Sequence, residues 1–286
     1  MLAPAKINLF LHVGPAKDNG RHDLDSLVMF AGPEASDRVE ARRASALSLT
    51  LDGPLAAPEL ATTDNLVLRT LSACASRGLR VPPMAIVLHK YIPVAAGLGG
   101  GSADAGAMLR QLVKLGTLTD QIAWTLAASL GGDVPAAYLA QACRMQGEGQ
   151  IVRRTPKLPD LPTLLVNPGL PCPTGPVFQA FDEQAGASDI TALDLPAFDH
   201  PPEMIAWLRG NSRNDLEAPA IELVPEIRNV LDALSELSGC ALSRMSGSGA
   251  SCFALFETRS ALVSATDALK SRHPNWWIAP TLLKGG

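Results

Sequence analysis

The sequence of 286 residues has no long apolar run and no excess of positive charge. No apolar stretch reaches the roughly 18 residues that a membrane-spanning helix needs. The formal net charge is −4, with 24 Lys and Arg against 28 Asp and Glu. Proteins that bind nucleic acid over a broad surface usually concentrate Lys and Arg. We therefore expect neither a membrane nor a nucleic acid among its partners.

Cysteine is scarce, and its spacing is not that of a metal or disulfide framework. The five cysteines are Cys74, Cys143, Cys172, Cys240 and Cys252. They are scattered and odd in number, so they do not match a zinc site, and reduced thiols are the ordinary state in the cytosol. Near the N-terminus, Lys6 and Asn8 interrupt the apolar stretch and no small-residue cleavage site follows, which argues against a signal peptide. We expect a cytoplasmic protein.

The composition is that of a folded globular protein. Hydrophobic residues make up 47% of the chain and charged residues 18%, and there is no internal repeat or low-complexity tract. The length allows one or two domains. Six prolines fall between Gln150 and Pro173, so we place a domain boundary there, with domains at residues 1–155 and 156–286.

Residues 6–13 alternate as a half-buried strand should, because successive side chains of a strand point to opposite faces. One predicted face carries Ile7, Leu9, Leu11 and Val13. The other carries Lys6, Asn8, Phe10 and His12. Further strands are expected near residues 47–51 and 85–88. Between them, Asp64 is placed to cap a helix that ends near Gly78.

The middle of the chain predicts helices. One begins near Ser102 and ends at Gly116, and the next is capped by Thr119 and stops at Gly131-Gly132. Asp133 then begins a short helix. A strand is expected at residues 163–166, and residues 182–203 are loop-like. The last third predicts helix, strand, strand, helix and strand over residues 222–237, 241–245, 252–256, 260–271 and 276–279. That order indicates an α+β sandwich.

A glycine-rich segment precedes the helix at Ser102. It comprises Pro93, Val94, Ala95, Ala96, Gly97, Leu98, Gly99, Gly100, Gly101, Ser102, Ala103 and Asp104. Glycines let a backbone approach phosphate oxygens, and the N–H groups of a first helical turn attract an anion. Ser102 would cap the helix and is the candidate to offer a hydroxyl to a phosphate or to a magnesium-bound water. No Lys follows the glycines, so this is not the P-loop of many nucleotide-binding proteins. The simpler alternative is a tight loop between a strand and a helix.

Two charged residues outside this segment suit phosphoryl transfer. Asp133 is a candidate general base for a substrate hydroxyl, although a carboxylate at a helix start is common. Lys6 would ordinarily be a solvated surface charge. It shares its predicted face with Asn8 and His12, and a cation beside a carboxylate would keep it ionised and offset charge on the transferred group.

A second glycine turn, Gly247-Ser248-Gly249, lies between the two strands expected at 241–245 and 252–256. The simpler interpretation is a hairpin of small residues. The functional interpretation is a lid whose backbone N–H groups face substrate or ATP phosphates.

These segments, in this order, resemble the GHMP kinases, a family named for galactokinase and the homoserine, mevalonate and phosphomevalonate kinases. The family's central motif matches Pro93 to Ala103, and its C-terminal glycine turn matches Gly247-Ser248-Gly249. Within the family, the chain resembles the members that phosphorylate a cytidyl diphosphate ester of methylerythritol. That likeness rests on the opening run from Pro4 to Leu11 and on Gly131–Pro135, with further matches at Asp64–Leu66 and Asn214–Glu217.

The resemblance implies an α+β two-domain fold. Its N-terminal half would resemble the second domain of ribosomal protein S5, and its C-terminal half a ferredoxin-like α/β sandwich. It also implies ATP and Mg²⁺, with Mg²⁺ held by the ATP phosphates and no protein ligand assigned beyond the candidate Ser102. We expect a small-molecule substrate and a monomer or weak homodimer.

The same resemblance assigns roles to residues. Lys6 and Asp133 would be the catalytic pair. The ATP site would be formed by the segment Pro93–Asp104 together with Asn65, Leu66 and Lys90. The substrate site would be formed by Asn8, Arg21, His22, Thr174, Phe178, Gly247, Ser248 and Gly249, with Phe178 stacking on cytosine.

One position departs from the family pattern. The family usually has Tyr before the histidine where this chain has Arg21 before His22, and that Tyr stacks on cytosine. A guanidinium plane also stacks on a base, so Arg21 is a candidate replacement. Two other functions stay open: another kinase of the family, acting on homoserine or mevalonate, and a catalytically silent ATP-binding regulator.

Overall fold

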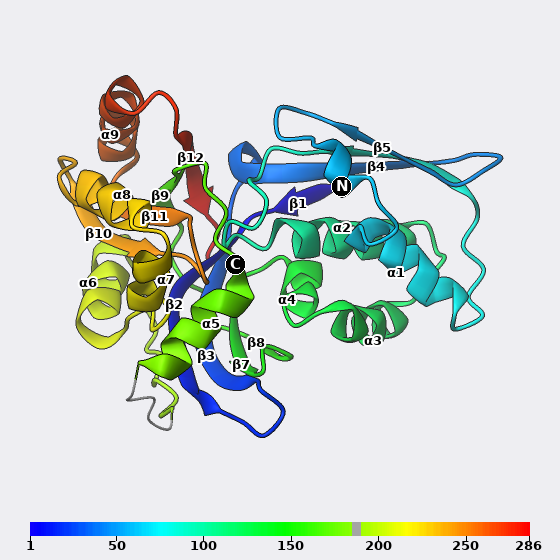
Figure 1. Cartoon of the computed structure of the whole chain (residues 1–286), viewed down its shortest axis with the longest axis horizontal. Helices are drawn as coiled ribbons and strands as arrows, with labels where there is room; N and C mark the ends of the chain where they lie inside the picture. The colour runs from blue at the N-terminus through cyan, green and yellow to red at the C-terminus, as the bar shows by residue number, and fades with distance from the viewer. Residues whose placement is uncertain (185–189) are drawn as a thin grey trace. The chain divides into compact units, whose positions relative to one another are not determined.

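The structure, a computed structural model, describes residues 1–184 and 190–286, which form two compact units (Figure 1). The first unit contains Met1–Ala5, Ala35–Val94 and Gly99–Ala140. The second contains Lys6–Glu34, Ala95–Leu98 and Gln141–Gly286. A single cut near residue 155 does not describe these units, because the strands that follow Ala5 pair with a strand beyond residue 140.

The first unit is built on a four-stranded sheet. Its order is β1-β4-β6-β5, and only the pair β5 and β6 is parallel. The strands are β1 (Leu2–Pro4), β4 (Ser36–Arg43), β5 (Ser48–Asp52) and β6 (Met84–His89). The helices are α1 (Leu66–Ala75), α2 (Gly100–Lys114), α3 (Asp120–Leu130) and α4 (Val134–Leu139), with short 3₁₀ turns η1 (Pro33–Ala35) and η2 (Pro58–Leu60). Figure 1 shows α1 and α2 on one side of the sheet, and their apolar faces form one core with Val39, Ile86 and Leu88.

The second unit contains two antiparallel sheets, ordered β2-β3-β7-β8 and β10-β11-β9-β12. The first has β2 (Lys6–Ala16), β3 (His22–Phe30), β7 (Cys143–Gly147) and β8 (Ile151–Arg154). The second has β9 (Leu161–Asn167), β10 (Cys240–Met245), β11 (Cys252–Phe256) and β12 (Trp277–Leu283). The helices are α5 (Thr174–Glu183), α6 (Pro201–Asn211), α7 (Glu217–Leu223), α8 (Glu226–Ser235) and α9 (Arg259–Arg272).

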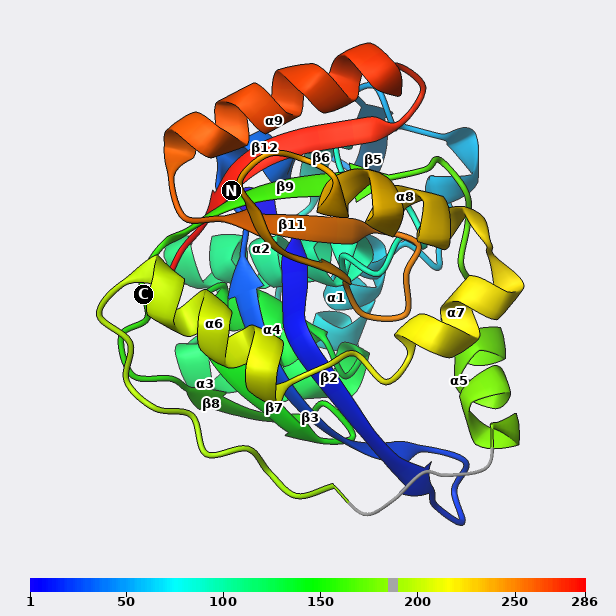
Figure 2. The ribbon, with the colours of Figure 1, turned by 90° about the vertical axis from the view of Figure 1, so that its left-hand side faces the viewer.

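The core of the second unit lies between the sheet of β9–β12 and its helices. Figure 2 shows α8 and α9 beside β9, β11 and β12. In α8 the buried residues Ile227, Val230, Leu231 and Leu234 repeat at the spacing of one helix face, which explains why this segment is an amphipathic helix. They pack in the same core as Leu164 and Ala254 of the sheet.

Several predicted elements are confirmed. The strands expected at 47–51, 85–88 and 252–256 are β5, β6 and β11, and Thr119 caps α3 as predicted. The helix predicted over 222–237 is confirmed as α8, but it begins later than predicted, at Glu226, because Val224-Pro225 separates it from α7. The cap of α1 is Asn65 rather than Asp64. The region 182–203 is not loop-like at its ends, where α5 and α6 lie, and residues 185–189 fall outside the described residues.

The half-buried strand predicted at 6–13 is wrong in its burial. Every residue of 6–13 is buried, on both predicted faces. The pairing of β2 with β3 also shifts between Asn8 and Phe10, where β2 carries one extra residue. The polar side chains at positions 6, 8 and 12 therefore need internal hydrogen-bond partners, because water does not reach them freely.

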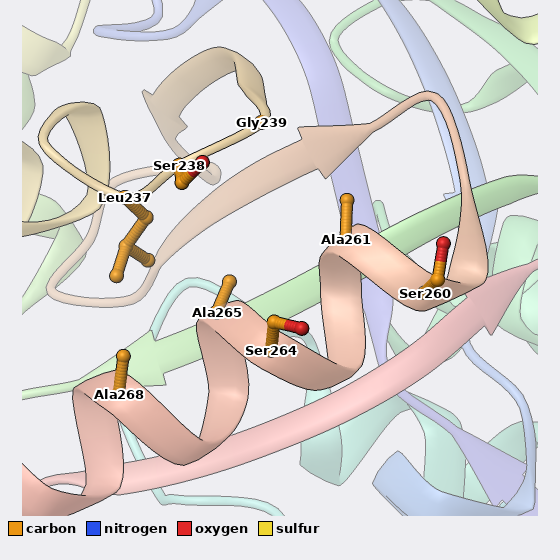
Figure 3. A pocket seen from close by; sticks show the side chains of 8 residues that line it. All are labelled: Leu237, Ser238, Gly239, Ser260, Ala261, Ser264, Ala265 and Ala268. Atoms are coloured by element: carbon orange, nitrogen blue, oxygen red, sulfur yellow. The ribbon is translucent and has the colours of Figure 1, made fainter.

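A small hollow of about 330 Å³ lies between the turn after α8 and the helix α9 (Figure 3). Its lining residues are Leu237, Ser238, Gly239, Ser260, Ala261, Ser264, Ala265 and Ala268. None of these carries a charge, and none is among the residues that the sequence assigns to a site. The hollow is therefore not the candidate active site.

Candidate active site

The glycine-rich segment makes a turn that only glycine fits at Gly97. Its φ is +73°, and a Cβ there would lie 2.2 Å from the carbonyl oxygen of Ser246. The carbonyls on this stretch are tied into the second unit: Ala95 O accepts from Cys172 N at 3.3 Å, and Leu98 O accepts from Lys6 N at 2.9 Å. The backbone of this turn is therefore fixed on its carbonyl side.

Helix α2 begins at Gly100, two residues before the predicted start. Its N-cap is Gly99, in the left-handed conformation, and no side chain within the described residues caps this end. The predicted cap by Ser102 is wrong, because Ser102 already lies in the first turn. The first-turn N–H groups point out of the helix without a side-chain acceptor, as an anion site requires.

The start of α1 lies beside the start of α2. A Cβ on Gly101 would lie 3.4 Å from Leu66 Cδ1, so Leu66 lies next to the first turn of α2. The Asn65 amide is already used: Oδ1 accepts from Val67 N at 2.9 Å, and Nδ2 donates to Leu60 O at 2.9 Å. Asn65 thus fixes the start of α1 rather than offering its whole amide to a ligand.

Lys90 and Asp104, both predicted near the nucleotide, form a buried cluster with Asp37. The Lys90 ammonium donates to Asp104 Oδ2 at 2.8 Å and also to Asp37 Oδ2. The other Asp37 oxygen accepts the backbone N–H groups of Tyr91 and Ile92. Lys90 and Asp104 are each 3% exposed. Their side chains therefore hold the start of α2 from inside, and their assignment to the ATP site stays a prediction.

Burial and the neighbouring charges shift the pKa values of Asp104 and Lys90 in this cluster. Burial raises the pKa of Asp104 to about 7, although the Lys90 ammonium opposes this. Asp104 Oδ1 is buried and has no hydrogen-bond partner among the described residues. Burial alone would lower the pKa of Lys90, but the two carboxylates raise it above its ordinary value.

We expect Asp104→Asn to reduce the pH dependence of stability. The folded carboxyl titrates near 7 and the unfolded one near 3.8, so between these values the native state binds more protons. Wild-type stability should therefore fall as pH rises through this window, by up to about 1.4 kcal/mol per pH unit from this group. Urea unfolding of both proteins at pH 5 and pH 7 measures the difference. A wild-type-minus-variant difference that is equal at both pH values would contradict the assignment.

In the second unit, Lys6 and Asn8 lie together on β2 as predicted. Lys6 Nζ donates to Asn8 Oδ1 at 3.1 Å, and Lys6 is 6% exposed. The backbone N–H of Asn8 donates to Ser246 Oγ at 3.1 Å, and that hydroxyl donates to Gly97 O at 3.2 Å. Ser246 therefore joins the strand that carries Lys6 to the turn at Gly97, called the phosphate turn below because the sequence predicts that it binds phosphate. Its role could not be predicted, because Ser246 is distant from both partners in the chain.

The second glycine turn joins β10 to β11, and it is buried. Asn214 Nδ2 donates to the carbonyls of Met245 and Gly247, at 2.9 and 2.8 Å. Thr174 and Ser248 share a hydroxyl hydrogen bond of 2.9 Å, which brings these two predicted substrate residues together. Asn214 was matched only as a motif in the sequence, and its role in holding this turn was missed.

His22 and Phe178 also lie together. Their ring centroids are 4.9 Å apart, and the His22 ring nitrogen Nε2 lies 2.7 Å from Asp182 Oδ1. Arg21, in contrast, is exposed. Its side chain is 71% exposed, and its Nη1 donates to Glu148 Oε2 at 3.0 Å. Hydrogen bonds from Asn19, Arg21 and Lys17 lower the pKa of Glu148 to about 2, so it stays ionised.

Asp133 lies in the first unit, at the N-cap position of α4. Its backbone carbonyl accepts from Ala137 N at 3.0 Å. Its side chain is partly exposed, and within the described chain it makes no capping hydrogen bond to α4. Asp133 thus lies at a helix start, as the simpler interpretation expects, but its side chain does not cap that helix.

No cluster of three or more His, Cys, Asp or Glu side chains that could hold a metal ion occurs in residues 1–184 and 190–286. In the same described part of the chain, no helix is long and apolar enough to cross a membrane.

Known proteins are similar to this chain in sequence and in fold. The family described as GHMP kinases N terminal domain matches residues 65–141, and GHMP kinases C terminal matches residues 195–275. A 4-diphosphocytidyl-2-C-methyl-D-erythritol kinase from Hyphomonas neptunium is 50% identical over 287 residues, covering 98% of this chain and 95% of the relative. One of the same name from Caulobacter vibrioides is 44% identical over 282 residues, covering 96% of each.

A crystal structure of 4-(cytidine 5'-diphospho)-2C-methyl-D-erythritol kinase is also similar. It has a TM-score of 0.76 and 32% sequence identity, and the match covers 100% of this chain and 99% of the other. The two-domain kinase fold expected from the sequence is thereby confirmed. The glycine turns, the buried strand with Lys6 and these likenesses together show that the chain belongs to the GHMP kinases.

Proposed function

We propose that this protein transfers the γ-phosphoryl group of ATP to the 2-hydroxyl of 4-diphosphocytidyl-2-C-methyl-D-erythritol. The observation that carries the proposal is the phosphate turn, in which Gly97 excludes any side chain and α2 starts without a side-chain cap. The relatives of that name, at up to 50% identity over nearly the whole chain, support this substrate over homoserine or mevalonate.

In this reaction Asp133 accepts the proton of the substrate hydroxyl, and Lys6 stabilises negative charge on the transferred group. The assignment rests on the resemblance, and two features support it. The Asp133 carboxylate makes no capping hydrogen bond to α4. The Lys6 ammonium donates to the amide oxygen of Asn8, which helps to orient the cation.

The ATP phosphates bind at the start of α2, where the first-turn N–H groups and the helix dipole favour anions. Mg²⁺ supplies neutralisation of phosphate charge when bound. Ser102 is the candidate to contact a phosphate or a magnesium-bound water, because it lies in the first turn of α2 and is partly exposed. Lys90 and Asp104 contribute to this ATP site by fixing the start of the helix through their ion pair.

The cytidyl group binds near His22 and Phe178, whose rings already contact each other, and near Thr174 and Ser248. An aromatic ring stacks on a base whichever base it is, so specificity for cytosine has to come from hydrogen bonds such as those of His22. We also propose that the protein works in the cytoplasm as a monomer or weak homodimer.

The test is a coupled assay of ADP release with the purified chain, ATP and Mg²⁺. Turnover is expected with the cytidyl substrate and not with homoserine or mevalonate. The opposite pattern would show a different kinase of the family. Tight ATP binding with no turnover of any of the three alcohols would favour the silent regulator, even though Lys6 and Asp133 are both present.

Arg21→Tyr should leave the KM for the cytidyl substrate unchanged or lower it. The ion pair of Arg21 with Glu148 is exposed, so its loss should cost little folding stability. A tyrosine restores the stacking residue usual in the family. KM and kcat from initial rates measure the effect, and Lys17→Met, which removes another cation beside Glu148, serves as the control. A large rise in KM for Arg21→Tyr alone would show a specific role for the guanidinium.

A further inference from the structure

Ser26 is a buried residue of β3 with no assigned role in the proposed reaction. It is 1% exposed and lies next to the amide of Asn8. Asn8 Nδ2 and Ser26 Oγ are 2.8 Å apart, and Ser26 Oγ is 2.6 Å from the carbonyl oxygen of Phe10. The Asn8 amide thus lies between the Ser26 hydroxyl on one side and the Lys6 ammonium on the other.

The directions of these hydrogen bonds are fixed by chemistry. A hydroxyl has one proton, and a carbonyl can only accept, so the Ser26 proton goes to Phe10 O. Ser26 Oγ must then accept from Asn8, which places the amide nitrogen of Asn8 at Ser26. The amide oxygen is left facing Lys6, whose ammonium can only donate. A reversed amide would set donor against donor at Lys6.

The shift in pairing between β2 and β3 makes this arrangement possible. Ser26 pairs with Leu11, and the extra residue between Asn8 and Phe10 lets Ser26 reach both Phe10 O and the Asn8 side chain. Bulges commonly redirect a side chain next to a functional site. Since Asn8 is also buried, at 3% exposure, water does not easily replace the hydroxyl.

We propose that Ser26 is a positioning residue for phosphoryl transfer, which fixes the amide of Asn8 and through it the ammonium of Lys6. The inference rests on the proposed function, because it assigns Lys6 to the transferred group. Ser26 itself does not touch a substrate in this scheme. Its removal should lower kcat and leave KM for ATP unchanged, because the amide can then rotate and Lys6 loses one fixed acceptor.

The experiment compares Ser26→Ala in two backgrounds. In the wild type, kcat should fall about tenfold, the size expected from loss of one hydrogen bond to an ordered charge. In Asn8→Ala, where the link is already absent, adding Ser26→Ala should change kcat less than about twofold. Thr266→Val is the matched control, because the Thr266 hydroxyl is buried and donates to Leu262 O at 2.7 Å, on a helix remote in sequence.

The outcomes separate the possibilities. An equal loss of kcat in both backgrounds, no loss in either, or a similar loss in Thr266→Val would overturn the proposal. Should Ser26→Ala fail to fold, Ser26→Cys keeps the volume with a much weaker hydrogen-bonding group and is measured in the same way.

A measurement without turnover distinguishes this proposal from the proposed function. The ammonium protons of Lys6 should give an NMR signal in the wild type, because a held and buried ammonium exchanges slowly with water. Ser26→Ala should broaden or remove that signal. If the wild type phosphorylates no cytidyl substrate, the proposed function fails, but the Lys6 signal still decides on Ser26. An unchanged signal in Ser26→Ala would refute the positioning role.

Discussion

Replacement of Asp133 by asparagine should abolish phosphoryl transfer while ATP still binds. Asparagine has the size of aspartate but cannot accept the hydroxyl proton, and a general base contributes about 10²- to 10⁴-fold to a rate. Turnover is measured by ADP release, and ATP affinity by calorimetry. We expect kcat to fall by that factor or more with little change in ATP affinity, since the phosphate turn belongs to a different segment.

The control for this variant is Asp120→Asn. Asp120 is another acidic residue at a helix start of the first unit, where its Oδ1 accepts from Tyr138 Oη at 2.6 Å. Its loss should lower stability slightly and leave turnover unchanged. The Asp133 side chain does not cap α4, so Asp133→Asn should not unfold that helix. A wild-type rate in Asp133→Asn would show that Asp133 is not the base.

Lys90→Met should destabilise the protein by about 3–5 kcal/mol, the cost of removing one partner of a buried ion pair. Without the ammonium, the carboxylates of Asp37 and Asp104 face each other in a buried position. Urea unfolding at pH 7 measures the loss. A companion effect on ATP affinity is expected, because Asp104 belongs to α2 and Lys90 follows β6, so the cluster ties the phosphate helix to the sheet.

A double variant makes this prediction specific. Lys90→Met combined with Asp104→Asn removes one of the two uncompensated carboxylates and should recover a large part of the lost stability. Lys17→Met, which breaks exposed ion pairs, should cost far less stability than Lys90→Met. If Lys90→Met cost no more than Lys17→Met, the cluster would not be a buried ion network.

The local pattern of residues was enough to predict many elements. Strand β11 was predicted with its observed bounds, because an apolar run between a glycine turn and a polar pair has few alternatives. The exchange of Asp64 for Asn65 as the cap of α1 is a shift of one residue, within the ordinary uncertainty of helix ends. The break between α7 and α8 was missed, although Pro225 marks it.

The candidate site was predictable only in part. The Lys6 and Asn8 pair on one strand, and the glycine turns, follow from short stretches of sequence. The burial of Lys90 does not, because its partner Asp37 lies 53 residues earlier and nothing near Lys90 reveals it. Ser246, Asn214 and Ser26 likewise act through partners far away in the chain, so local periodicity contains no signal for them.

The interleaving of the two units has a consequence for synthesis. A ribosome has released every residue of the first unit by Ala140, whereas the second unit still lacks β7 through β12. The hairpin of β2 and β3 is made early, but the strand that covers the free edge of β3 begins only at Cys143. An uncovered strand edge pairs readily with other chains. From Phe30 to Cys143, therefore, the growing chain carries β3 without the strand that pairs with its second edge.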